Sequence, residues 1–209
     1  MPNYCQNNLS VWGDITELSD FKRNCLVKAD AGSPYEFDFT FEGLYPTPQE
    51  LADNQSPVNK TDDETESDFK ARLKRYEEDY GYTNWYEWRI HNWGTKWDAS
   101  ETIIITNESD ELYIGFDTAW APPINWLKKV SIQYPNLSFR MDYMEEGQNY
   151  CGAIRIGDGE IVEDEGEPIY TNDQGEEVYR DDDGGWWYTK SSERVEDEAF
   201  WPISHNPFV

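Results

Sequence analysis

The sequence predicts an α+β fold in which an antiparallel sheet carries two helices on one face. Strand and helix patterns follow one another as strand, helix, strand, strand, helix, strand, and aromatic residues make up 16% of the 209 residues. Because disordered chains are poor in aromatic residues, this content indicates a packed interior despite a net charge of −26. A βαββαβ order can close as the split βαβ, or ferredoxin-like, arrangement.

The first strand and helix are predicted near the N-terminus. Residues 8–12 (NLSVW) favour a strand with Leu9 and Val11 on one face. Gly13-Asp14 ends this strand, and the apolar spacing that follows predicts a helix from about residue 17 to residue 25, capped by Asp14 or Thr16.

An insertion is predicted at about residues 28–101, between this helix and the second strand. In residues 35–42 (YEFDFTFE) aromatic and polar side chains alternate, as is typical of an extended segment with one buried face. Helices are predicted at residues 62–80 and 83–93, and Gly94 is well placed to end the second one in a left-handed conformation.

The second half of the chain supplies the remaining elements of the sheet. The patterns predict strands at 102–106, 111–116, 137–144 and 150–156, and a helix at about 123–134. Residues 1–156 therefore form the predicted ferredoxin-like domain.

Residues 157–209 are predicted as an acidic extension rich in β-hairpins and packed on the same core. From Arg155 to Ala199 the chain carries sixteen acidic and four basic residues. Turn signals such as TNDQGEE alternate with short apolar groups, which favours hairpins with carboxylates at the turns and on the outer faces.

The charge of the chain limits its partners. With 43 acidic against 17 basic residues, the electrostatic field repels nucleic acid and anionic lipid and favours proteins with basic surfaces. The N-terminal sequence lacks a signal-peptide pattern, and no segment approaches the ~20 apolar residues of a membrane span, so we expect a cytoplasmic protein. The three cysteines lack metal-ligand spacing, and neither a metal nor a cofactor is expected.

The Trp-rich stretch NWYEWRIHNWGTKWDAS, residues 84–100, allows two interpretations. Its apolar side chains cover most of the predicted helix, which favours an aromatic plug in the core. The alternative is a ligand-binding or catalytic cleft lined by His91, Asn92, Lys96 and Asp98, in which His91 is the base, Lys96 stabilises charge and Asp98 orients. No nucleophile motif accompanies these residues, so an enzyme is not expected.

Three segments, in this order, resemble a known family: MPNYCQNNLSVWGD, FEGLYPTPQEL and WYEWRIHNWGTKWDA. They are similar to the Api-type proteins of phages, prophages and conjugative plasmids, which are uncharacterised and have a ferredoxin-like domain. The resemblance covers about residues 1–151. It implies a ferredoxin-like fold and an origin in a mobile element, and it supplies no catalytic residues.

The leading hypothesis is a non-enzymatic accessory protein that binds a basic surface on a host protein. One version is nucleic-acid mimicry, in which carboxylates displace DNA or RNA from a host defence factor. A structural component of the virion and a protein with the cleft described above are the alternatives. The competing interpretation of the acidic residues is a charged outer face that only keeps the protein soluble. The predicted partner-binding residues are Glu160, Glu163, Asp164, Glu165, Glu176, Glu177, Asp181, Asp182 and Asp183.

Overall fold

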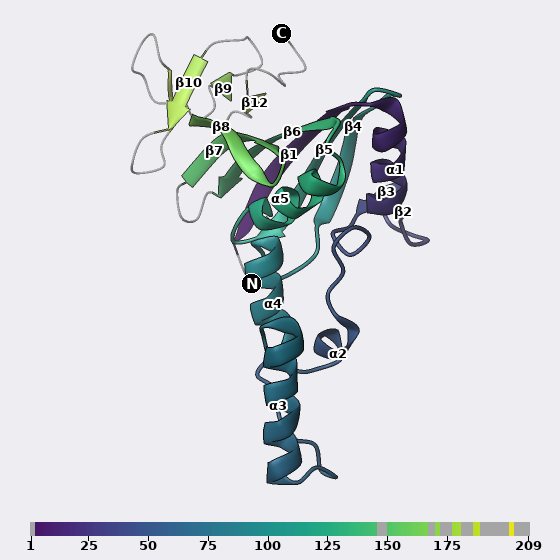
Figure 1. The fold of residues 1–209 in the computed structure, drawn as a ribbon. Helices are drawn as coiled ribbons and strands as arrows, with labels where there is room; N and C mark the ends of the chain where they lie inside the picture. The colour runs from purple at the N-terminus through teal and green to yellow at the C-terminus, as the bar shows by residue number, and fades with distance from the viewer. Residues whose placement is uncertain are drawn as a thin grey trace.

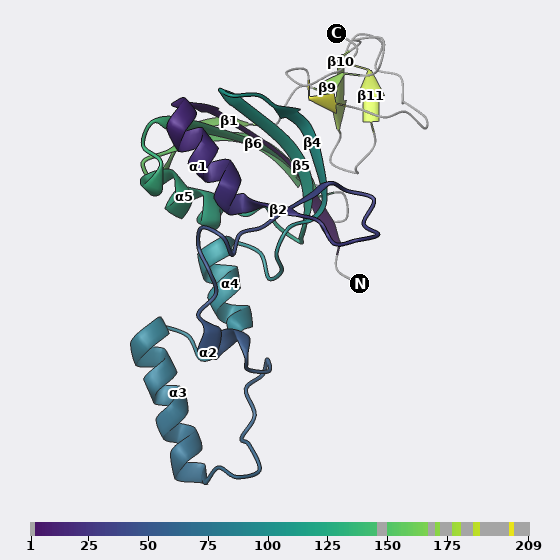
Figure 2. The same ribbon diagram turned by 90° about the vertical axis from the view of Figure 1, so that its right-hand side faces the viewer.

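The computed structural model describes residues 3–145, 150–166, 170–171, 177–180, 186–188 and 201–202. Its centre is a six-stranded antiparallel sheet of order β4-β5-β1-β6-β7-β8. The order β4-β5-β1-β6, with two helices on one face (Figures 1 and 2), is the predicted ferredoxin-like arrangement. Its elements are β1 (Tyr4–Gly13), α1 (Ile15–Cys25), β4 (Ser100–Asn107), β5 (Glu111–Ala119), α5 (Ile124–Gln133) and β6 (Leu137–Glu145).

Strand β1 lies between β5 and β6 and begins at Tyr4, earlier than the predicted start at Asn8. The added part contains a buried polar residue, Asn7, whose side-chain amide donates to the Phe116 carbonyl at 3.2 Å and to Thr118 Oγ1 at 2.9 Å. These hydrogen bonds allow Asn7 to be buried. The strand was predicted from the alternation of apolar residues. Asn7 is polar, so the pattern did not include residues 4–7.

Helix α1 is capped by Asp14, one of the two predicted caps. One carboxylate oxygen of Asp14 accepts hydrogen bonds from the backbone N–H groups of Thr16 and Glu17, both at 3.0 Å. Leu18 and Phe21 of this helix are fully buried against the sheet.

The alternating segment 35–42 forms a shorter strand than its pattern predicts. Strand β3 (Phe37–Phe39) pairs with β2 (Leu26–Lys28) and ends at Phe39. Phe39 and Phe41 are both buried, as the alternation requires. The strand ends early because the Phe41 N–H donates to the Asp98 carboxylate at 2.7 Å, and the Phe41 carbonyl accepts hydrogen bonds from the N–H groups of Leu44 and Tyr45 in a turn.

An arm of three helices stands out from the sheet (Figures 1 and 2). Helix α3 begins at Glu66, after the predicted start at residue 62, because Thr65 and Asp68 form a capping box. Gly94 follows the last helix with a φ of 93°, the left-handed conformation that its position predicts. The helices are α2 (Gln49–Ala52), α3 (Glu66–Tyr80) and α4 (Trp85–Trp93).

The main sheet continues past residue 156 into the predicted extension. Strands β7 (Tyr150–Gly157) and β8 (Glu160–Gly166) form a hairpin, and its turn residues Asp158 and Gly159 have φ values of 49° and 81°. Positive φ at both positions is the type I′ geometry that favours Asp-Gly. A second sheet has the order β11-β10-β9-β12, formed by β9 (Tyr170–Thr171), β10 (Glu177–Arg180), β11 (Trp186–Tyr188) and β12 (Trp201–Pro202).

The hydrophobic core lies between the sheet and helices α1 and α5. It continues into the base of the arm through Trp88 and Trp93 of α4. Within the described residues, we find no helix with both the length and the apolar character needed to cross a membrane.

Candidate functional site

Strand β8 carries the described part of the predicted acidic surface. The side chains of Glu160, Glu163 and Asp164 are exposed on it. Because β8 is hydrogen-bonded to β7, the backbone that carries these carboxylates is fixed in the main sheet. Of the other predicted residues, Glu165 lies in β8 and Glu177 in β10. Outside the described residues lie Glu176, Asp181, Asp182 and Asp183.

Two basic side chains lie beside these carboxylates. Lys128 Nζ of α5 lies 3.3 Å from Glu160 Oε2, and Arg155 Nε of β7 lies 3.5 Å from Glu163 Oε2. The glutamate side chains remain 80% and 58% exposed. Ion pairs at such exposure contribute at most about 1 kcal/mol each. A basic partner can therefore replace Lys128 and Arg155 as the counter-charge at little energetic cost.

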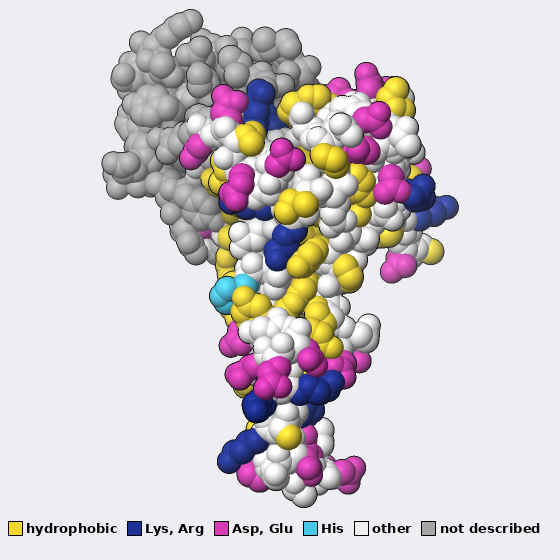
Figure 3. Space-filling view, in the orientation of Figure 1, with side chains coloured by type: hydrophobic (Ala, Val, Ile, Leu, Met, Phe, Trp, Pro, Cys, Tyr) yellow, Lys and Arg dark blue, Asp and Glu magenta, His cyan; other side chains and the backbone are white. Residues whose placement is uncertain are grey.

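The acidic side chains of the face in Figure 3 extend from the sheet to the tip of the arm and are interspersed with Lys and Arg. On this face the negative charge is therefore not confined to one patch. Apolar side chains gather instead around the base of the arm (Figure 3).

The Trp-rich segment packs into the core mainly through Trp88 and Trp93. Trp93 is fully buried, its indole N–H donates to the Tyr45 carbonyl at 2.9 Å, and its ring centroid lies 5.5 Å from that of Phe41. These contacts agree with the predicted aromatic plug. Trp97, by contrast, is 41% exposed, because it follows the Gly94 turn and lies on the surface.

The first two residues of the alternative cleft contact different neighbours. The His91 ring stacks on Tyr82, with 4.8 Å between centroids, and its Nδ1 lies 2.8 Å from the Glu87 carbonyl oxygen. The side-chain oxygen of Asn92 accepts a hydrogen bond from Lys129 Nζ at 2.7 Å. The side chains of His91 and Asn92 thus contact different side chains, Tyr82 and Lys129.

Lys96 lies between two indole rings. Its ammonium nitrogen is 3.9 Å from the ring centroid of Trp97 and 3.8 Å from that of Trp120. Trp120 has a φ of 70°, which is rare for a bulky side chain. Cation–π contacts of this kind contribute about 0.5–2 kcal/mol. Lys96 therefore has a structural role that ties the Gly94 turn to the end of β5.

Asp98 follows the Gly94 turn and joins it to the segment just after β3. Its carboxylate accepts hydrogen bonds from the Thr40 hydroxyl at 2.6 Å and from the backbone N–H of Phe41 at 2.7 Å. Burial raises the pKa of Asp98, although these hydrogen bonds act in the opposite direction. Among the described residues, these side-chain contacts of the four cleft residues go to different partners: Tyr82, Lys129, the two indole rings and Thr40.

A buried ion pair on the sheet face opposite the helices was missed by the sequence patterns. Arg140 Nη2 lies 3.0 Å from Asp142 Oδ1, and the Asp142 side chain is 1% exposed. Tyr113 lies on the same face across β1, and burial together with the Asp142 charge raises its pKa. The only sequence signal was polar residues at alternate positions of LSFRMDYM, a pattern that usually marks a face in water.

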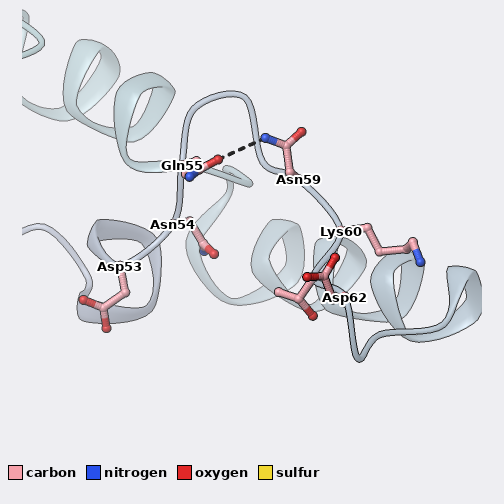
Figure 4. Close-up of a pocket in the computed structure, with 7 residues that line it drawn as sticks. Asp53, Asn54, Gln55, Asn59, Lys60 and Asp62 are labelled. Carbon is pink, nitrogen blue, oxygen red and sulfur yellow. Dashed lines mark hydrogen bonds between the residues drawn. The ribbon is translucent and has the colours of Figure 1, made fainter.

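A polar pocket of about 390 Å³ lies in the arm between α2 and α3 (Figure 4). Its lining includes Asp53, Lys60 and Asp62, and Asn59 donates a hydrogen bond to the side-chain oxygen of Gln55 at 3.1 Å. Positive and negative groups are mixed there, so its charge does not select one kind of ligand. A search of the described residues finds no group of three or more His, Cys, Asp or Glu side chains that could hold a metal ion.

Comparison with known families supports the resemblance inferred from the sequence. Residues 92–183 match the family described as a ferredoxin-like domain in Api92-like protein. This match starts within the Trp-rich segment and continues past residue 151, where the inferred resemblance ended, into the acidic extension. The ferredoxin-like fold is thus supported both by this match and by the strand order β4-β5-β1-β6.

Two individual proteins are similar to this chain. The uncharacterized protein YubB of Escherichia coli (strain K12) is 27% identical over 84 residues, which are 40% of this chain and 58% of YubB. The chain thus matches little more than half the length of this curated relative. The crystal structure of a protein api92 from Yersinia pseudotuberculosis aligns with a TM-score of 0.49 at 11% identity, over 79% of this chain and 98% of that one.

Proposed function

We propose that this protein is a non-catalytic accessory protein of a phage or another mobile element, and that it binds a basic surface of a host protein in the host cytoplasm. The observation that carries the proposal is that Glu160, Glu163 and Asp164 are all exposed on the hydrogen-bonded strand β8. Carboxylates on a strand are held in place before binding, so less conformational entropy is lost when a partner binds.

The net charge supports the same proposal. A charge of −26 attracts proteins with basic surfaces over long distances and raises their association rate. Proteins that bind nucleic acid hold the phosphates largely through Lys and Arg, so carboxylates on a strand can compete for the same side chains. We therefore propose nucleic-acid mimicry against a host defence factor as the specific form of the interaction.

The alternative, a ligand-binding or catalytic cleft at residues 91–98, receives less support. A general base must lie within hydrogen-bond reach of its substrate and be oriented by a neighbour. The geometry instead gives His91 a tyrosine ring and a backbone carbonyl as neighbours, and it places Asp98 against Thr40 and Phe41.

The proposal is tested by capture of partners from a bacterial lysate on three immobilised baits. The first bait is the natural protein, and the second carries Glu160→Gln, Glu163→Gln and Asp164→Asn. The third bait is the matched control, with Glu66→Gln, Glu77→Gln and Glu78→Gln on α3. Both variants lose three exposed carboxylates and break two surface ion pairs.

We expect the natural protein and the α3 variant to retain a basic partner that is released as salt rises. The β8 variant should lose that partner. Equal retention on all three baits, or a partner unaffected by molar salt, would argue against the proposal.

A further inference from the structure

Strand β4 is an edge of the main sheet. Among the described residues it pairs with β5 alone. Ile103 and Ile105 are 56% and 53% exposed. Natural edge strands are commonly protected by Lys, Pro or β-bulges. Strand β4 (SETIIITN) has no Lys or Pro, and its register shifts lie between Ser100 and Ile103 and between Ile104 and Thr106, which leaves Ile103-Ile104 regularly paired. Such an edge is a template on which a further strand can pair.

A groove of about 490 Å³ runs beside this edge, between residues 34–37 and β4. Tyr35, Phe37 and Ile103 contribute apolar walls to it. Two hydrogen bonds fix the opposite wall to β4, since the Phe39 N–H donates to Thr102 Oγ1 at 2.9 Å and the Tyr35 hydroxyl donates to the Glu101 carboxylate. The groove is therefore part of the folded structure.

The charge around the groove is mainly negative. Glu36 is the one charged residue in its lining. At one end of the groove, Glu101 accepts a hydrogen bond from the Tyr35 hydroxyl. Asp117 lies close to Glu101, and both burial and the Glu101 charge raise its pKa. Lys28, opposite Phe37 in the β2–β3 pair, is the nearby base.

We propose that the β4 edge binds an extended segment of a partner protein, in which apolar side chains alternate with Lys or Arg. The segment pairs as an added strand, in which apolar side chains pack on Ile103 and the Lys or Arg side chains lie in the negative field of Glu36, Glu101 and Asp117. A second copy of this chain fits less well, because each copy carries a charge of −26. The inference rests on the proposed function, and it names the class of segment that the basic partner contributes.

The first test uses a fluorescent peptide of about seven residues, a typical strand length, in which Lys and Val alternate. Its binding to the full-length protein is followed by fluorescence anisotropy. The control peptide has the same side chains, but every backbone amide is N-methylated, so neither of its edges can donate hydrogen bonds to β4. We expect saturable binding of the first peptide and binding at least about tenfold weaker for the control. Equal binding of both peptides, or of neither, would overturn the proposal.

The second test uses variants of the protein, with thermal melts to confirm that each is folded. We expect Ile103→Lys and Ile105→Lys each to lower the affinity for the Lys-Val peptide at least about tenfold. Ile132→Lys on α5 adds the same charge at a residue that is 63% exposed and should leave binding within about twofold. If the α5 variant weakens binding as much as the edge variants, charge alone explains the contact and strand pairing is wrong.

Lysate capture separates this inference from the proposed function. If Ile103→Lys still retains the basic host partner at full strength, the edge is not the contact, and the proposed function stands without it. If the natural protein captures no basic partner although the peptide binds the edge, the proposed function fails while β4 remains a strand-binding edge.

Discussion

Trp93 and Trp97 lie four residues apart and contribute differently to stability. Trp93 is fully buried, and its indole N–H is hydrogen-bonded, whereas Trp97 is 41% exposed beside Lys96. Trp93→Ala should therefore lower the free energy of unfolding by about 3–5 kcal/mol, and Trp97→Ala by about 1 kcal/mol. Chemical denaturation of both variants measures this. Equal losses would mean that the two rings are packed alike.

Asp98 gives a prediction about pH. Because burial raises its pKa, the folded protein holds this proton more tightly than the unfolded chain does. Ionised Asp98 thus disfavours folding, and its contribution to the free energy of unfolding rises as the pH falls from neutrality through the raised pKa. Asp98→Asn should remove this contribution. Denaturation between about pH 4 and pH 7 should show a weaker rise for the variant, and identical profiles would contradict the assignment.

These two residues also show what the sequence could reveal. The burial of Trp93 was predictable, because neighbouring apolar residues cover most of its helix. The role of Asp98 was not predictable, because its partner Thr40 lies 58 positions away and the contact exists only in the folded chain. The pair Arg140–Asp142 was missed because charged residues at alternate strand positions usually face water.

At the scale of elements, Arg72 links α3 to the loop before it. Its guanidinium binds both carboxylate oxygens of Glu64, each at 2.8 Å, and donates to the Asn59 carbonyl at 3.2 Å. Arg72→Met should cost about 1.5–3 kcal/mol locally and speed hydrogen exchange in residues 53–65, while exchange in β1 stays unchanged.

Lys74→Met is the matched control for Arg72. It removes an exposed ion pair with Glu78, 3.4 Å in length, on the outer side of the same helix, and should alter neither region. If both variants change exchange in the loop alike, the bonds of Arg72 are not what holds it.

The elements of the sheet were predictable where one local pattern decides the structure. Strands β4, β5 and β6 and helix α5 follow their apolar periodicity. Strand β3 is short because the Phe41 N–H binds Asp98 and a turn begins at its carbonyl. Helix α3 starts late because Thr65 forms a capping box. The pairing of β8 with β7 was not predictable from a local pattern, because it depends on contacts between strands.

At the scale of the whole molecule, the charge of −26 should reduce stability through self-repulsion. Raising NaCl from about 0.01 M to about 0.15 M shortens the screening length from about 30 Å to about 8 Å. The Tm should therefore rise with salt over this range, as scanning calorimetry can show. Matched concentrations of KCl are the control, because screening depends on ionic strength and not on which monovalent cation is added. A Tm that changes with neither salt would mean that the acidic charges are too well separated to repel.

The central claim, that the carboxylates of β8 bind a basic partner through ionic contacts, is tested most directly by the salt dependence of affinity for the captured partner. Purified partner is titrated against the natural protein, the β8 variant and the α3 variant at several NaCl concentrations. The logarithm of the affinity should fall steeply with the logarithm of salt for the natural protein and the α3 variant, and less steeply for the β8 variant. The same slope for all three proteins would contradict the account.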